Sequence, residues 1–313
     1  MVDTLNLWMD KAVTGTADTF HVAAYLSDVT EKQSERWGYS LTGRVGDYTV
    51  TISERGIYLM GSLAKHYLPS NIYTLTRATV KEALQMLSDQ LHIDVVAAII
   101  RRLDFSTVIP TKRPPADYFS RLGGKPYFKR LQAAAETLYY NTQKMQLIFY
   151  DKTKEAMAKG VEIPPALAGC NLFRYELRFL QRLQQQFKLA EPPTAAILYN
   201  QDFYYWLVGA WRAEFQTIQK IKNTMTMTDQ IRTPREVEKV LLSQYMQRDG
   251  GQSVVSRVLA DLRAKKVFAD PKAYTRVKNN LNAILSNPTA ASGQDELIAE
   301  IEQAINNIAK YAH

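Results

Sequence analysis

Cysteine and histidine are scarce in this chain. Its 313 residues include one cysteine, Cys170, and four histidines, and no two histidines stand in an H-x-H or H-E-x-x-H spacing. A single cysteine excludes an intramolecular disulfide framework and any zinc site that needs two thiolates. The histidine spacing gives no indication of a histidine-based metal site. The sequence is therefore typical of a protein from a reducing compartment.

Long hydrophobic runs and several glycine-rich signatures are also missing. The longest aliphatic run, at 95–100, is far shorter than the about 20 residues that a membrane-spanning helix needs. No G-x-G-x-x-G, G-x-x-x-x-G-K-[ST] or G-x-S-x-G motif occurs, so a nucleotide-binding loop or a nucleophile elbow is unsupported. We expect a soluble intracellular protein with no membrane partner.

Basic residues outnumber acidic ones. Lys and Arg total 39 against 31 Asp and Glu, a formal net charge of +8, which favours a polyanionic partner such as nucleic acid. Residues 253–280 hold seven basic and two acidic side chains, whereas 294–313 hold one basic and four acidic ones. Either the basic stretch binds DNA, with Lys265, Lys266 and Arg276 as contacts, or it forms solvated helix faces.

Strand and helix patterns alternate up to about residue 190, and the pattern beyond is almost entirely helical. Hairpins are predicted from strands at 48–53 and 56–63, and at 137–140 and 145–152. Thr79 and Glu82 match a capping box at the start of an amphipathic helix over 79–91. Helix starts are also indicated at 233–236 and 270–271, and breaks at 250–251 and 287–288.

These patterns predict an α+β fold. We expect an antiparallel sheet with helices packed on one face, followed by a mainly helical C-terminal region. The chain is divided accordingly into a domain over 1–190 and a region over 191–313. A chain with 46% hydrophobic residues is able to bury a core of that size.

Three predicted strands, at 99–109, 145–152 and 172–179, have one apolar and one polar face. Their polar faces carry Asp104, Tyr150 and Glu176 at the centre. Acids are depleted in strands, so Asp104 and Glu176 need a reason to be there. Either they neutralise neighbouring arginines, or the two carboxylates converge on a divalent cation.

Tyr150 is ambiguous in the same way. Alternation along the strand places it on the face of Lys152, and a nearby cation favours the phenolate over the phenol. One of 18 tyrosines is more often a packing residue than a nucleophile, however. Tyr140 on the adjoining strand is the second candidate, with its phenol reaching the polar face and Tyr139 pointing the other way.

The three strands, read in order, resemble a known family. The matching segments are R-L-D-F at 102–105, L-I-F-Y-D-K at 147–152 and F-R-Y-E-L-R at 173–178, with D-T-L-N-L at 3–7, G-S-L-A-K-H-Y at 61–67, Y-F-K-R-L at 127–131 and L-Y-Y-N at 138–141. They are similar to the gene II/X family of filamentous-phage and plasmid replication initiators. The resemblance covers about residues 1–225.

Members of that family begin rolling-circle replication by nicking one strand of a DNA origin. The resemblance implies that 1–190 is a nicking domain in which Tyr150 attacks the DNA, leaving a 5′-phosphotyrosine and a free 3′-OH for later rejoining. It implies that Lys152 assists and that Asp104 and Glu176 hold Mg²⁺ or Mn²⁺. Many rolling-circle initiators bind metal through a His-hydrophobe-His pair, which this chain lacks.

The resemblance also implies partners. The expected ligand is a supercoiled or single-stranded DNA origin, with Arg102, Arg174 and Arg178 balancing phosphate charge and residues 191–313 as a helical accessory or DNA-binding region. Host helicase and polymerase would act with the protein in the cytoplasm of a bacterial host cell, and the oligomeric state stays open. The alternative is a non-catalytic origin-binding regulator of phage or plasmid replication.

Overall fold

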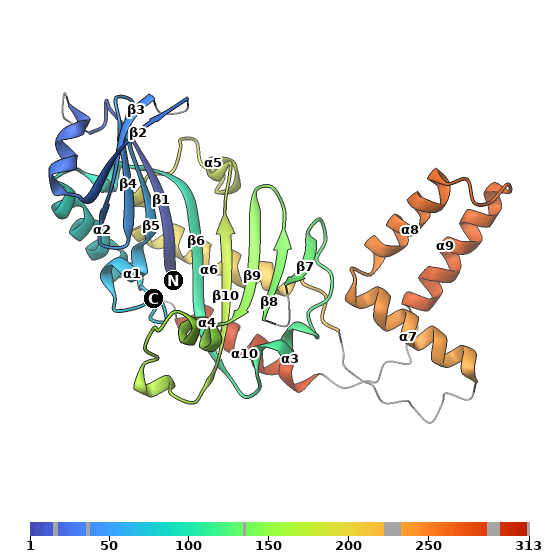
Figure 1. The fold of residues 1–313 in the computed structure, drawn as a ribbon. Coiled ribbons are helices and arrows are strands. Elements are labelled where there is room, and N and C mark those ends of the chain that lie inside the picture. Colours follow the sequence, from blue (N-terminus) through green and yellow to red (C-terminus); the bar gives the residue numbers. More distant parts are fainter. Residues whose placement is uncertain (15–17, 36–37, 134–135, 222–232, 287–294, 312–313) are drawn as a thin grey trace.

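A single ten-stranded antiparallel sheet organises the computed structural model (Figure 1), which confirms the predicted fold class. The structure describes residues 1–14, 18–35, 38–133, 136–221, 233–286 and 295–311. The strands follow the order β2-β3-β4-β5-β1-β6-β10-β9-β8-β7. They are β1 (Val2–Asp10), β2 (Ser27–Ser34), β3 (Gly38–Val45), β4 (Tyr48–Ser53), β5 (Gly56–Ser62), β6 (Ile99–Thr111), β7 (Lys129–Ala133), β8 (Thr137–Asn141), β9 (Met145–Asp151) and β10 (Asn171–Phe179).

Both predicted hairpins are present. Strands β4 and β5 pair with Ser53 opposite Gly56, and β8 and β9 pair with Asn141 opposite Gln146. Gly56 has φ +149°, and a Cβ added to it would lie 2.1 Å from the Met9 carbonyl oxygen of β1. Only glycine fits there, because β5 must approach β1 closely just after the turn.

The helices begin at residues that cap them. They are α1 (Leu63–Tyr67), α2 (Arg77–Leu91), α3 (Pro115–Phe119), α4 (Lys152–Ala158), α5 (Leu183–Gln186), α6 (Gln201–Gln216), α7 (Pro234–Arg248), α8 (Gln252–Ala264), α9 (Pro271–Leu285) and α10 (Glu296–Tyr311), with 3₁₀ turns at Thr19–Tyr25, Val95–Ala97, Pro165–Leu167 and Ala195–Tyr199. Across the described ranges, no helix combines the length and apolar character needed to cross a membrane.

The predicted helix starts and breaks can be compared with these boundaries. Thr233 with Glu236 and Asp270 cap α7 and α9 as predicted, and the break at 250–251 separates α7 from α8. The break at 287–288 lies outside the described residues. The capping box of α2 is one turn earlier than predicted, because Thr76 and Thr79 cap each other reciprocally and Glu82 instead accepts a hydrogen bond from Tyr67.

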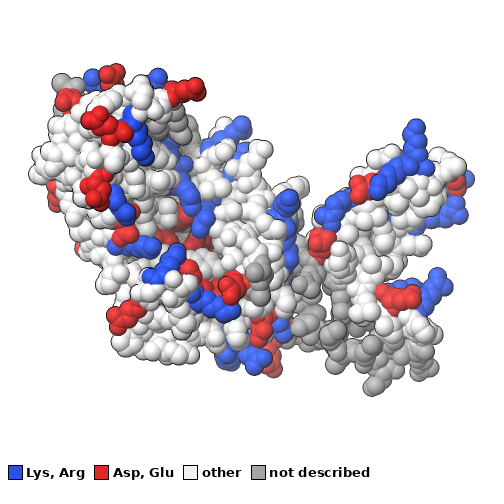
Figure 2. All heavy atoms as spheres, viewed as in Figure 1, with Lys and Arg blue, Asp and Glu red and all other residues white. Residues whose placement is uncertain are grey.

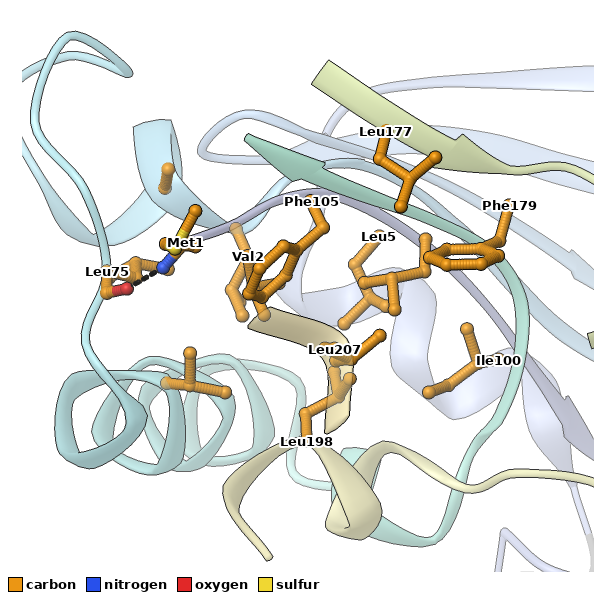
Figure 3. Packing of buried hydrophobic residues seen from close by; sticks show 14 of the residues in the cluster. Met1, Val2, Leu5, Leu75, Ile100, Phe105, Leu177, Phe179, Leu198 and Leu207 are labelled. Atoms are coloured by element: carbon orange, nitrogen blue, oxygen red, sulfur yellow. Dashed lines mark hydrogen bonds between the residues drawn. The ribbon is translucent and has the colours of Figure 1, made fainter. Parts of the chain in front are cut away.

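The apolar face of the sheet packs against α2, α6 and α10 (Figure 1). In Figure 3, Leu5, Phe105 and Leu177 from three neighbouring strands point toward Leu207 of α6. Farther along α6, the Trp211 ring stacks on Tyr175 of β10 with centroids 4.8 Å apart. Full burial of each large apolar side chain stabilises the fold by roughly 1.5–3 kcal/mol. This layer fixes the orientation of the sheet and leaves its other face for polar side chains.

The last helix returns to this core. Ile298, Ile301 and Ile305 of α10 belong to the same hydrophobic cluster as the sheet, and Asp295 pairs with Arg121 at 2.8 Å. The core of the sheet therefore extends well past residue 190. Helices α7 to α9 have a smaller cluster of their own, formed by Met246, Val254, Val255 and Leu259, and stand to one side in Figure 1. We call these helices, residues 233–286, the helical insert.

Two substitutions test this division into two cores. Ile301→Ala leaves a cavity in the sheet core and should lower its free energy of unfolding by about 2–5 kcal/mol, whereas Val255→Ala in the helical insert should change it by less than about 0.5 kcal/mol. All four tryptophans lie outside residues 233–286, so urea unfolding followed by tryptophan fluorescence reports on the sheet core. Equal shifts in the two variants would mean that one cooperative core includes both parts.

Candidate active site on the polar face of the sheet

The face of the sheet opposite α2, α6 and α10 carries the polar side chains that the strand patterns predicted. Strand β10 pairs with β6 so that Arg178 lies opposite Asp104 and Glu176 opposite Ser106, and it pairs with β9 so that Arg174 lies opposite Tyr150. Opposed residues share a face, so all of these side chains lie on one side of the sheet. We call this side the polar face. In Figure 2, basic and acidic side chains lie together over these strands.

Asp104 and Glu176 are joined by one guanidinium. The Nε and Nη2 atoms of Arg178 donate to Glu176 Oε2 at 2.9 and 2.6 Å, and the same Nε lies 3.2 Å from Asp104 Oδ2. Arg102 donates to both Asp104 oxygens, at 2.8 and 2.7 Å. The two acids thus lie on the same face of neighbouring strands, as expected. Of the two interpretations of these acids, the arrangement seen is pairing with arginine.

Arg174 holds the buried part of this network. Its side chain is 2% exposed, and it donates to Asp3, to Glu176 Oε1 at 3.1 Å and to Ser106 Oγ at 2.7 Å. Burial alone would lower the pKa of Arg174, but the neighbouring phenol and carboxylates raise it above its ordinary value. A guanidinium so enclosed contacts protein groups rather than solvent. Its position differs from that of Arg102 and Arg178, whose side chains are 31% and 26% exposed.

Tyr150 is hydrogen-bonded to one of the predicted acids. Its hydroxyl donates to Glu176 Oε1 at 2.9 Å. Burial raises the pKa of Tyr150 well above its ordinary value; Arg174 opposes this shift and the Glu176 charge adds to it. Burial would also raise the pKa of Glu176, but Arg174, Arg178 and the bonds from Arg178 and Tyr150 lower it to about 2. The resting pair is therefore a neutral phenol on an ionised carboxylate.

Lys152 reaches the network from a helix and not from a strand. Strand β9 ends at Asp151, whose carboxylate accepts from Lys154 N at 3.0 Å and caps α4, so the strand alternation used to place Lys152 does not apply. The Lys152 side chain is 1% exposed and its Nζ donates to Asn71 Oδ1 at 2.7 Å and Glu155 Oε2 at 2.5 Å. Burial and then Arg174 lower the pKa of Lys152, against the opposing effect of Glu155.

The expected orientations of Tyr139 and Tyr140 are wrong. Tyr140 is fully buried among the helices and donates to the Gly123 carbonyl at 2.6 Å, whereas Tyr139 lies opposite Ile148, the residue opposite Glu176 on the polar face. The three-residue turn between β8 and β9 sets this register, and a shift of one residue would exchange the two faces. Tyr139, and not Tyr140, is therefore the tyrosine that neighbours Tyr150 on the same face.

The carboxylates as arranged do not fit a metal ion between them. All four oxygens of Asp104 and Glu176 accept hydrogen bonds from Arg102, Arg174, Arg178 or Tyr150. Divalent cations take oxygen ligands that are not neutralised by guanidinium groups. Within the described part of the chain, no group of three or more His, Cys, Asp and Glu side chains is placed to hold a metal. Binding of Mg²⁺ or Mn²⁺ at these acids stays a prediction, and we derive no step through it.

Some members of the network had not been predicted as site residues. Asp3, Asn71, Ser106 and Glu155 all contact Arg174 or Lys152. Asp3 had a signal in the sequence, since it is an acid at the start of an apolar strand. Asn71 had none, because it lies in the loop between α1 and α2, which no period describes. With these residues the network joins four cationic and four anionic side chains, Arg102, Arg174, Arg178 and Lys152 with Asp3, Asp104, Glu176 and Glu155.

The remaining predicted contacts lie elsewhere. Lys265 and Lys266 follow α8, and Arg276 lies on α9 with its Nη2 2.7 Å from Asp270 Oδ2; all three are exposed. They belong to the helical insert, where basic side chains gather on the upper edge in Figure 2. The structure therefore places them apart from the polar face.

The low pKa of Glu176 predicts how stability depends on pH. A carboxyl group with a lowered pKa stabilises the fold above its ordinary pKa of 4.5, and this contribution is lost as the pH falls toward 2. Glu176→Gln should therefore flatten the decline of the free energy of unfolding between these pH values, measured by urea titration. Glu136→Gln, which alters a surface pair with Lys154, should keep the wild-type slope. The same slope in all three proteins would contradict the assignment.

Comparison with known proteins agrees with this architecture. Residues 1–204 match the family described as the N-terminal part of the replication-associated protein of phage gene II, a span that includes the sheet and every residue of the polar network. A comparison with curated proteins gives no match. Because the family match covers about two thirds of the chain, this protein belongs to the family of filamentous-phage gene II replication initiators.

Proposed function

We propose that this replication protein nicks and rejoins one strand of a DNA origin through Tyr150. The observation that carries the proposal is the position of the Tyr150 hydroxyl, which donates to Glu176 inside an arginine cluster. A phosphodiester needs a nucleophile in line with its leaving oxygen and positive groups near its non-bridging oxygens. The polar face offers both within two adjacent strands.

Arg102 and Arg178 are the guanidiniums proposed to bind the scissile phosphate. Both are partly exposed, and guanidiniums bind phosphate oxygens in a bidentate manner. Arg174, which is buried, is proposed as a positioning residue that holds Glu176 and Asp3. Lys152 is proposed to assist by adding positive charge behind Tyr150.

Phosphate binding would also prepare the base. When Arg178 turns its donors to a phosphate, Glu176 loses two hydrogen bonds and a neighbouring positive charge, and both losses raise its pKa. A more basic Glu176 accepts the Tyr150 proton more readily. Formation of the bond from Tyr150 Oη to phosphorus then accompanies cleavage of the bond from phosphorus to O3′. The departing O3′ takes up the proton from Glu176 and becomes the free 3′-OH.

The phosphotyrosine keeps the energy of the broken bond. Reversal of the step by a 3′-OH therefore rejoins the strand, which direct hydrolysis would not allow. Mg²⁺ or Mn²⁺ dependence is part of the proposal as a measurable property, without assigned ligands. We further propose that the protein acts in the bacterial cytoplasm with host helicase and polymerase. The alternative function, a non-catalytic origin-binding regulator, predicts binding without a nick.

Tyr150→Phe tests the nucleophile. The substitution removes one hydroxyl and keeps the ring, so the fold should survive while nicking and the covalent adduct are lost. The measurement is conversion of a supercoiled plasmid carrying the origin to open circles, with Mg²⁺, Mn²⁺ or EDTA, followed by detection of protein on the 5′ end. Tyr139→Phe on the same face is the matched control and should keep activity. A 5′ adduct formed by Tyr150→Phe would overturn the assignment.

Neutralising the basic residues of the helical insert tests the second DNA contact. Lys265→Gln, Lys266→Gln and Arg276→Gln combined should weaken duplex binding and lower the slope of log K against log salt by up to about 3, roughly one for each lost phosphate contact. Lys32→Gln on β2, at the opposite edge of the sheet, should leave the slope unchanged. An unchanged slope in the triple variant would mean that these side chains are solvated helix faces.

A further inference from the structure

Tyr127 combines an exposed ring with an unfavourable backbone. Its side chain is 99% exposed, the largest value among the exposed apolar and aromatic residues of the described chain. Its φ is +66°, in the left-handed region that bulky residues avoid. Glycine would occupy this position without steric conflict. A tyrosine that neither packs nor relieves strain stabilises nothing in the isolated chain.

The loop that carries Tyr127 is firmly anchored on both sides. Gly123 N donates to the Gln219 carbonyl at 2.7 Å, and Gln219 N donates to the Gly124 carbonyl at 2.8 Å. The Lys125 side chain is 3% exposed; its Nζ lies 2.7 Å from Glu214 Oε2 and 4.7 Å from the centroid of the Phe128 ring. The ring of Tyr127 is thus held out into solvent by a fixed support.

This loop lies between the two parts of the molecule that are proposed to bind DNA. On one side it leads into β7, where Lys129 and Leu131 are exposed and Leu131 lies opposite Tyr139. Tyr139 in turn lies opposite Ile148, so this row continues across the polar face to Glu176. On the other side Gly124 abuts Gly250 of the helical insert, where an added Cβ would lie 2.5 Å from the Gly250 Cα.

We infer that Tyr127 stacks on a base of single-stranded DNA where the strand enters the polar face. An exposed aromatic ring is the group that unpaired bases stack on, and Lys129 beside it is placed for a backbone phosphate. The inference rests on the proposed function for the choice of DNA as ligand. Its test measures binding, so it does not require the protein to nick.

The test compares Tyr127→Ala and Tyr127→Phe with wild type, using fluorescence anisotropy of a labelled single-stranded oligonucleotide and of the same sequence as a duplex. Loss of the ring should weaken single-strand binding by roughly 5- to 150-fold, and duplex binding by less, because paired bases are already stacked. Tyr127→Phe keeps the ring and should bind within about twofold of wild type. Tyr311→Ala removes another exposed tyrosine, on α10, and should bind like wild type.

Tyr127→Gly separates binding from folding. It should lose single-strand binding as Tyr127→Ala does, while its melting temperature equals or exceeds that of wild type, because glycine relieves the backbone strain. Wild-type affinity in Tyr127→Ala would overturn the inference and leave the ring to a protein partner; equal losses in Tyr127→Phe and Tyr127→Ala would also overturn it. Absence of nicking by wild type, with Tyr127-dependent binding intact, would overturn the proposed function alone.

Discussion

The Arg174 guanidinium is the group on which the polar face depends. It is buried between β1, β6 and β10 and joins Asp3, Ser106 and Glu176, one from each strand. Taking these charges out of water is unfavourable, so a network of this kind adds little net stability, but removal of one partner costs about 3–5 kcal/mol because it leaves an unpaired buried charge. The network therefore fixes where Glu176 lies, and with it the hydroxyl of Tyr150.

Charge balance gives the site its proposed response to DNA. Four cationic and four anionic side chains neutralise one another in the resting protein, and the neutral Tyr150 phenol is stabilised by that balance. A phosphate adds negative charge at Arg102 and Arg178, the two guanidiniums that solvent reaches. The same arginines that bind the substrate are thus those that suppress the basicity of Glu176. In this proposal, substrate binding and activation of the nucleophile are one electrostatic event.

The return of α10 to the core gives the molecule its layout. Because Ile301 packs beneath the sheet and Glu300 accepts hydrogen bonds from Lys112 N and Tyr118, the chain on both sides of the helical insert is held by the sheet core. The turn between α7 and α8 then abuts Gly124, next to the loop that presents Tyr127. Basic helices, an exposed ring and the polar face follow one another across the molecule, an order that suits a duplex leading to a separated strand.

Local patterns in the sequence determined the strands, the hairpins, most helix starts and the shared face of Asp104, Glu176 and Tyr150, because a period of two residues and a capping side chain act within a few positions. Tertiary structure decided the rest. The register across a turn reversed the expected faces of Tyr139 and Tyr140, and a helix start at Asp151 moved Lys152 off its strand. Asp3 and Asn71 joined Arg174 from distant segments, and arginines took the carboxylate oxygens. Such pairings depend on which strands become neighbours, and the hydrophobic core, not any local spacing, makes that choice.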